Sequence, residues 1–234
     1  MELQIQGLLF LGIIPALFLL YISLKGYEGT YKEKSIFLTF IIGIVFGVIA
    51  AIVRFITNPL PALELGIVNA LVYVIIYALF EQLFKTIILN MRRLQGKKEA
   101  VIYGLSLGLG FGSSFTPFLV ILGSLSSESN FTFVSIVTFG SLGFILLHAA
   151  TSAYIGYGVY RNKLMKFLLL AIMIQLPFNF IVEASRYYSQ SYHVYLQAGL
   201  VIYGLIVFWY VIKYIVPQIL KDKNRKRTKK TKTV

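Results

Sequence analysis

The sequence contains no cysteine, only two histidines and only nine acidic residues among 234 positions. Without cysteine, disulfide bonds, thiolate nucleophiles and zinc–thiolate sites are excluded. The histidines form no His-Glu-x-x-His motif, and no glycine-rich phosphate-binding loop with its lysine is present. The sequence therefore indicates neither a zinc metalloprotease nor a nucleotide-driven pump, and it predicts no metal site and no cofactor.

Charged residues are scarce and apolar runs are long. Hydrophobic residues make up 58% of the chain and charged residues 13%, with a mean hydropathy of +0.79. This composition is typical of a polytopic membrane protein. Windows long enough to cross a bilayer predict an all-α fold with seven transmembrane helices. The expected spans are residues 3–24, 35–56, 65–91, 100–123, 131–160, 166–184 and 194–216.

The distribution of lysine and arginine predicts the orientation. Of 22 such residues, eighteen lie between spans one and two, three and four, or five and six, or in the tail from Lys221. Arg54 and Arg186 fall on the other side, while Lys85 and Lys213 lie within or at the edge of spans. The positive-inside rule then places the N-terminus outside and the C-terminus in the cytoplasm.

The predicted organisation is one membrane domain, residues 1–220, followed by a basic tail, residues 221–234, that we expect to be disordered. The first span begins without a basic leader, so we expect it to be retained rather than cleaved as a signal peptide. The tail carries eight cations and no aromatic residue to stack on a base, so its expected partner is anionic lipid headgroups and not nucleic acid. The expected location is the cell membrane, or an internal membrane if the source is eukaryotic.

Polar side chains recur along one face of the third predicted span. Glu81 and Lys85 lie one helical turn apart, on the same face as Asn69, Tyr73 and Tyr77. Charged residues within a membrane usually face the interior of a helix bundle and mark a functional site. The other polar positions at a similar depth are His148 with Thr151 and Ser152 in the fifth span, and Gln175, Asn179 and Glu183 in the sixth. At about 1.5 Å per residue, Glu81, His148, Gln175 and Asn179 all lie about 15 to 20 Å from the cytoplasmic end, so we expect them to meet in one layer.

The fourth span carries small residues at a spacing of four. Gly104, Gly108 and Gly112 permit close approach of another helix, so they are predicted to serve helix packing. Ser113 and Ser114 follow at the expected midplane depth. Their hydroxyl groups either bond to their own helix or line a polar cavity.

Several of these motifs together resemble a known family. The run Phe80 to Lys85, the glycine-rich fourth span, Leu146 to His148, and Gln175 with Asn179 are similar in order to the motifs of PrsW-type intramembrane proteases. That superfamily includes CAAX-processing proteases. Over the whole chain the sequence is most similar to a relative of these enzymes, the non-catalytic subunit of gamma-secretase called anterior pharynx-defective. The resemblance implies a seven-span bundle with a polar cavity formed by spans three to six.

The sequence departs from the protease pattern at several positions. Gln82 stands where the family has a second glutamate, and the stretch from Gly112 to Pro117 lacks the further glutamates of the family's fourth span. Gln175 stands where the family has a histidine, although Asn179 is kept. One carboxylate and one histidine do not supply the three protein ligands usual for a catalytic metal. The resemblance therefore implies a degenerate active site.

These observations favour a scaffold that holds or presents another membrane segment, with the partner helix beside the glycine face or near the polar layer. One alternative is an active intramembrane protease, with Glu81 as base and His148 as acid or oxyanion donor. Another is a proton-coupled or small-solute transporter. A purely structural interpretation makes the Glu81–Lys85 pair an interhelical or intrahelical salt bridge that fixes helix register, with His148 bonded to a backbone carbonyl or Gln175. The residues predicted to line the polar cavity or bind a ligand are Lys85, Gln82, Gln175, Asn179, Ser113 and Ser114.

Overall fold

A computed structural model describes residues 5–25, 31–57, 62–118, 131–187 and 190–219, and within these ranges the secondary structure is helical, without a strand. The predicted basic tail lies outside the described residues. The helices are α1 (Ile5–Leu24), α2 (Glu33–Thr57), the short 3₁₀ helix η1 (Ala62–Leu65), α3 (Ile67–Leu89), α4 (Glu99–Ser113), α6 (Phe131–Tyr160), α7 (Leu164–Tyr187), α8 (Gln190–Tyr210) and the π-helical turn η2 (Val211–Ile215).

Five of the described helices, α2, α3, α6, α7 and α8, are long and apolar enough to cross a membrane. Residues Phe10–Leu24 of α1 form a shorter apolar helix. The fourth predicted span is helical in α4, turns at Ser114 and is helical again over residues 115–118, while residues 119–130 lie outside the described ranges. The all-helical class is therefore confirmed, and the number of crossings stays a prediction.

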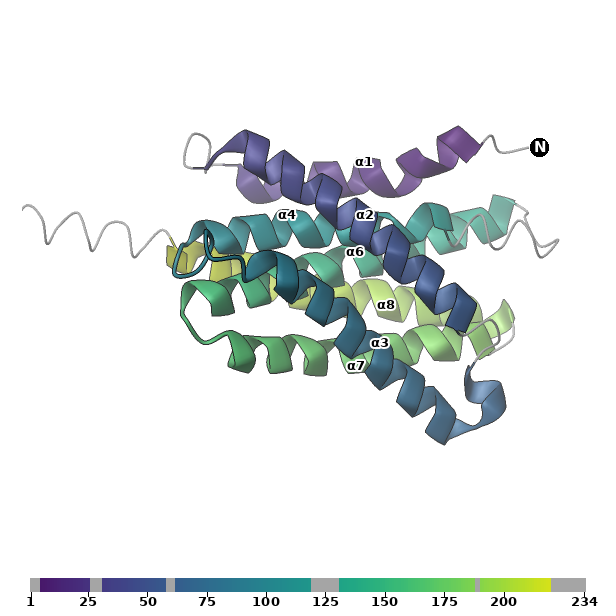
Figure 1. Cartoon of the computed structure of the whole chain (residues 1–234). Coiled ribbons are helices and arrows are strands. Elements are labelled where there is room, and N and C mark those ends of the chain that lie inside the picture. The colour runs from purple at the N-terminus through teal and green to yellow at the C-terminus, as the bar shows by residue number, and fades with distance from the viewer. Residues whose placement is uncertain (1–4, 26–30, 58–61, 119–130, 188–189, 220–234) are drawn as a thin grey trace, which may run out of the picture.

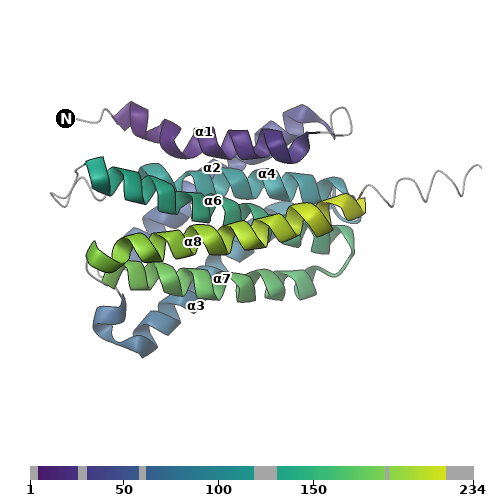
Figure 2. The same ribbon diagram turned by 180° about the vertical axis from the view of Figure 1, so that it is seen from behind.

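Successive helices run in alternating directions along one bundle axis (Figure 1). Helix α4 occupies the middle of the bundle, with α1 and α2 on one side and α6 on the other. Figure 2 shows the opposite side, where α8 and α7 lie next to α6. Helix α3 crosses the bundle at an angle and packs mainly on α7. The first described turn of α1 and the end of η2 lie at opposite ends of the bundle.

The central position of α4 depends on glycine. Every residue from Ala100 to Ser113 is buried. Gly104, Gly108 and Gly112 all face α6, and a Cβ atom on Gly108 would lie only 2.1 Å from the carbonyl oxygen of His148. On another side of α4, Gly110 meets the backbone of α2, where a Cβ atom would lie 2.0 Å from the carbonyl oxygen of Phe40. The helices therefore touch through their backbones, as the spacing of the three glycines predicted.

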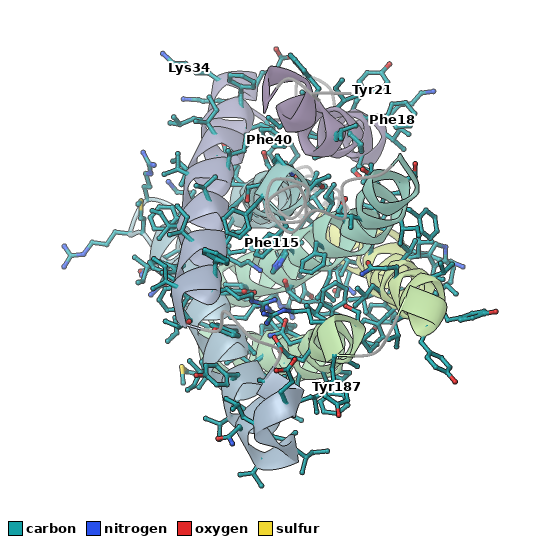
Figure 3. The ribbon with its side chains drawn as sticks, turned by 90° about the vertical axis from the view of Figure 1, so that its right-hand side faces the viewer. Phe18, Tyr21, Lys34, Phe40, Phe115 and Tyr187 are labelled. Atoms are coloured by element: carbon teal, nitrogen blue, oxygen red, sulfur yellow. The ribbon has the colours of Figure 1, made fainter. Side chains whose placement is uncertain are left out.

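The outer surface carries the large apolar side chains expected of a helix bundle in lipid. Phe18 and Tyr21 of α1 point outward, whereas Phe40 and Phe115 lie inside the bundle (Figure 3). The end of α1, the start of α2, the α3–α4 loop and the α6–α7 loop lie at one end of the bundle (Figure 1). The exposed cations at this end are Lys25, Lys32, Lys34, Arg92, Arg93, Lys97, Arg161, Lys163 and Lys166.

Candidate functional site

Four helices contribute buried polar side chains to one cluster in the interior of the bundle. All of its members are almost completely excluded from solvent, apart from Arg54, whose side chain is 11% exposed. We call this group the polar cluster. It consists of Arg54 from α2, Glu81, Gln82 and Lys85 from α3, His148 and Thr151 from α6, and Gln175 and Asn179 from α7.

Glu81 is the carboxylate of the cluster, and each of its oxygens is engaged. Oε1 accepts a hydrogen bond from Nη2 of Arg54 at 3.1 Å. Oε2 accepts a hydrogen bond from Nε2 of Gln175 and lies 3.8 Å from Nε2 of His148. One side chain on α3 is thereby connected to α2, α6 and α7. A buried charge is tolerated when it is paired and hydrogen-bonded in this manner.

Lys85 occupies the cytoplasmic side of the cluster in the predicted orientation. Its Nζ atom contacts Nδ1 of His148 at 2.7 Å, and it donates to Oγ1 of Thr151 at 3.2 Å and to Oε1 of Gln82 at 3.4 Å. These three contacts match the three donors of an ammonium group. The expected Glu81–Lys85 salt bridge is therefore not the arrangement found, because Arg54 is the ion-pair partner of Glu81.

His148 lies between the lysine and the glutamate. When the Lys85 side chain donates to Nδ1, the ring proton is on Nε2, which faces Oε2 of Glu81. The ring stacks on Phe115 with centroids 5.5 Å apart and contacts Phe111 at 4.7 Å. The imidazole is bonded to a lysine side chain and held by aromatic rings, and not by the backbone carbonyl or Gln175 considered from the sequence.

Amide side chains close the network on α7. Gln175 donates to Glu81 and accepts from Nε2 of Gln82, so both ends of its amide are used. Asn179 accepts from Nη2 of Arg54 at 3.2 Å and donates to the carbonyl oxygen of Val74 at 3.3 Å. Gln82 and Gln175 thus contact each other directly.

Arg54 is a member of the cluster that the sequence did not predict, because its position near a span end suggested an outer, solvated cation. The guanidinium carbon lies 4.7 Å from the ring centre of Tyr77 and 5.9 Å from that of Phe115, within cation–π range. The pattern of small residues on α2 could have indicated that Arg54 faces the interior of the bundle. Gly43, Gly47, Ala50 and Ala51 are buried and recur at helical spacing, and Arg54 continues that face.

A second ion pair lies on α7, close to the short helix η1. Arg186 donates to both carboxylate oxygens of Glu183 at 3.3 Å. The backbone nitrogen of Ala62, at the start of η1, also donates to Oε2 of Glu183, at 3.2 Å. Glu183 therefore anchors η1 to α7, and both arginines assigned to the outer side by the sequence form ion pairs with buried carboxylates.

Ser113 and Ser114 do not bond to the polar cluster. Their hydroxyl groups donate to carbonyl oxygens of their own helix, those of Gly110 and Phe111. The two serines also line contacts with other helices, since the carbonyl oxygen of Ser113 lies against Gly12 and the hydroxyl of Ser114 against Gly47. Phe111 and Phe115 are the side chains of this region that face His148.

The cluster holds one carboxylate, two cationic side chains and one imidazole. Among the described residues, no group of three or more histidine, cysteine, aspartate or glutamate side chains is placed to hold a metal ion. Oε2 of Glu81 lies 3.8 Å from Nε2 of His148, the imidazole of the cluster. The geometry therefore offers one glutamate–histidine pair, enclosed by amide and cationic groups.

Comparison of the chain with protein-family models, with curated proteins and with solved structures found no significant match.

Proposed function

We propose that the chain crosses the membrane seven times, with the N-terminus outside and the C-terminus in the cytoplasm. The five long apolar helices support this, because α1 and α4 pack among them in the same alternating order. The exposed cations gathered at one end of the bundle support the orientation, since positive loops are retained in the cytoplasm.

The absence of native cysteine makes a topology test direct. Leu65→Cys lies at the end expected outside, and Lys97→Cys lies at the end expected in the cytoplasm; both side chains are exposed. A membrane-impermeant thiol reagent should label Leu65→Cys in intact cells, and Lys97→Cys only after permeabilisation. The reverse pattern would contradict the proposed orientation. Labelling of both variants in intact cells would place positions 65 and 97 on the same side of the membrane and would contradict the crossing by α3.

Within this membrane domain we infer a scaffold that holds another membrane segment, built on a degenerate protease-like site. The observation that carries the inference is the engagement of both Glu81 oxygens, by Arg54 on α2 and Gln175 on α7. A general base must be within hydrogen-bond reach of the water it activates. In this arrangement the carboxylate instead joins helices to each other, which suits a bundle that must keep a fixed shape.

The partner segment cannot use the glycine face, contrary to one expectation from the sequence. Gly104, Gly108 and Gly112 are already covered by the backbone of α6. The outward side of α3 is a more suitable surface, because this helix crosses the bundle at an angle and exposes large apolar side chains such as Val72, Ile76 and Leu83. We infer from the resemblance to the gamma-secretase subunit that the partner is a transmembrane segment of another protein.

The scaffold proposal is tested by two measurements on the purified protein. Incubation with a panel of single-span substrates should give no cleavage that depends on Glu81, with Glu64→Gln as the control because Glu64 is an exposed acid. A photo-crosslinker at Ile76 should capture a membrane segment that a crosslinker at the exposed Ile202 of α8 does not capture. Cleavage abolished by Glu81→Gln but not by Glu64→Gln would overturn the scaffold.

An active intramembrane protease is the second candidate, and one observation favours it. Oε2 of Glu81 and Nε2 of His148 lie 3.8 Å apart, although the two residues come from different helices. Such a pair could divide the roles of base and acid. This candidate requires that Glu81→Gln and His148→Ala each abolish cleavage of a single-span substrate by protein that is still recovered folded, as measured by size-exclusion chromatography.

We also propose that the basic tail, residues 221–234, associates with anionic headgroups of the membrane in which the domain lies, which is the cell membrane or an internal membrane of a eukaryote. Its eight cations directly follow an apolar helix. Cationic segments beside a span are attracted to anionic lipid by about 1 kcal/mol per residue. Truncation after Leu220 should weaken the retention of anionic lipid during purification.

A further inference from the structure

We propose that the α3–α4 and α6–α7 loops together bind the headgroup of a phospholipid that carries more than one phosphate. The inference rests on the proposed membrane crossing and not on the scaffold function. We call the surface the two-loop site. Its exposed cations are Arg92, Arg93, Lys97, Arg161, Lys163 and Lys166.

The two loops are fixed to each other and to the core. The backbone nitrogen of Gly96 in the first loop donates to the carbonyl oxygen of Val159 at the end of α6, at 3.3 Å. Gly96 has a φ angle of 68°, which favours glycine and lets the chain turn toward α6. Leu94, only 7% exposed, inserts into the hydrophobic core between these cations. The loops therefore present their charges from one connected backbone.

The second loop is also tightly closed. Lys163 donates its backbone N–H to the carbonyl oxygen of Gly158 at 2.9 Å, while Asn162 adopts a φ of 52°. The guanidinium of Arg161 lies 5.9 Å from the ring centre of Tyr157. Tyr157 in turn donates to Oε1 of Gln218 at 2.5 Å, which brings the last described turn of the chain to the same place. Figure 1 shows both loops and the yellow C-terminal turn at one end of the bundle.

The charge of this site is strongly unbalanced. Residues 90–100 and 160–167 contain seven lysines and arginines, and their one carboxylate is that of Glu99. Like charges held together by a fixed backbone repel each other, and a ligand with several negative charges relieves more of this repulsion than a ligand with one. The electrostatics therefore favour a headgroup with two or more phosphates over a headgroup with a single negative charge.

The neighbouring surface favours a lipid over a soluble polyanion. Met165, which is 66% exposed, lies in sequence between the cations Lys163 and Lys166. One helical turn further along α7, Leu169 is 56% exposed. A phospholipid would bring phosphates to the loops and acyl chains to these side chains, whereas a nucleic acid would leave the apolar side chains uncovered. Basic sites at the cytoplasmic ends of transmembrane helices bind lipid headgroups in this way.

The test uses the full chain in phosphatidylcholine nanodiscs that contain either cardiolipin, with two phosphates, or phosphatidylglycerol, with one, at equal total charge. Native mass spectrometry measures the lipid retained. We expect cardiolipin to be retained about tenfold better. The triple variant Lys97→Gln, Arg161→Gln, Lys163→Gln should lose about a hundredfold in cardiolipin affinity, since each surface cation contributes roughly a factor of five.

The matched control removes the same number of charges at the same end of the bundle. The variant Lys25→Gln, Lys32→Gln, Lys34→Gln changes residues at the end of α1 and the start of α2, outside both loops of the site. This control should lose less than about threefold, because its side chains do not belong to the two loops and salt screens the attraction between exposed charges that are not in contact. All six side chains are exposed, so both variants should keep the thermal stability of the parent.

Three outcomes would overturn the proposal. Equal losses in the two triple variants would mean unspecific attraction to the membrane surface. Equal retention of cardiolipin and phosphatidylglycerol would mean that the number of phosphates is not recognised. Binding of free inorganic polyphosphate by detergent-solubilised protein, together with no preference among lipids, would assign the two-loop site to a soluble polyanion.

Discussion

Two interhelical contacts of this bundle are built on opposite principles. Between α4 and α6, three glycines bring backbone against backbone, with Gly104 facing the carbonyl oxygen of Ser152 and Gly108 that of His148. Between α3 and its neighbours α2, α6 and α7, the polar cluster joins the helices through long side chains such as Arg54 and Lys85. The first contact depends on the absence of side chains, and the second depends on their charge.

The difference teaches how each contact can fail. A glycine contact has no group to leave unsatisfied, so it fails by overlap of atoms when a side chain is added. The polar cluster has room for its own long side chains, and it fails when one partner is removed and another is left buried without a hydrogen bond. Single substitutions can therefore break one contact and leave the other intact.

The largest effect is expected from Gly108→Leu in the α4–α6 contact. A Cβ atom at this position would lie 2.1 Å from the carbonyl oxygen of His148, so the two backbones would have to separate. We expect no folded protein to be recovered after extraction in mild detergent, as measured by size-exclusion chromatography. Gly199→Leu on α8 is the matched control because nothing lies within 4 Å of its Cβ position. Equal recovery of the two variants would contradict a close glycine contact.

The next largest effect is expected from Arg54→Leu in the polar cluster. Glu81 would remain buried without its cation, and breaking a buried ion pair costs about 3–5 kcal/mol. The measurement is the thermal unfolding midpoint in detergent, with the exposed Arg92→Leu as control. The double variant Arg54→Leu, Glu81→Gln should regain part of the loss, because it removes the unpaired charge. A double variant less stable than Arg54→Leu would argue against this pairing.

A smaller loss is expected from Gln175→Leu, which removes an amide and no charge. Oε2 of Glu81 and Nε2 of Gln82 would each lose a hydrogen bond, for a cost of about 1–3 kcal/mol. The control is Gln95→Leu, since Gln95 is exposed in the α3–α4 loop. The same unfolding measurement should give a midpoint between those of the parent and Arg54→Leu. An unchanged midpoint would show that the amide bridge does not stabilise the cluster.

The smallest effects are expected at two buried serines. Ser106 of α4 donates to the carbonyl oxygen of Ile36 on α2 at 2.7 Å, so Ser106→Ala should cost about 0.6 kcal/mol, the average for such bonds in membrane proteins. The hydroxyl of Ser152 on α6 is buried without a hydrogen-bond partner among the described residues. Ser152→Ala should therefore leave the unfolding midpoint unchanged or raise it slightly. A lower midpoint for Ser152→Ala than for Ser106→Ala would contradict this assignment.

Helical periodicity predicted much of the cluster, because residues four apart lie on one helix face. Glu81 and Lys85 are both buried on α3, and Gln175, Asn179 and Glu183 are buried on α7. The same pattern failed toward the start of α3, where Asn69 is exposed and donates to the carbonyl oxygen of Leu65. Because an α-helix has about 3.6 residues per turn, residues spaced four apart move gradually around its surface. Helix α3 also crosses the bundle at an angle. Only part of the stripe can therefore face the interior.

Arg54 illustrates a different limit of sequence reasoning. Charge near the end of an apolar span is usually solvated, so the general pattern favoured the outer surface. The side chain instead turns toward Glu81 and Asn179, which follow it by 27 and 125 positions in the chain. Pairing over such separations depends on which helices become neighbours, and no local pattern contains that information.

Composition and periodicity by themselves determined that this chain forms apolar helices, that α4 offers a glycine face and that α3 and α7 turn amide and charged side chains inward. These properties follow from each helix alone. The tertiary structure decided that α6 covers the glycines and that Arg54 is the ion-pair partner of Glu81. It also decided that two basic loops share one edge of the bundle. The physical reason is that an amphipathic face specifies the need for a neighbour, whereas close packing of the whole bundle selects which neighbour meets it.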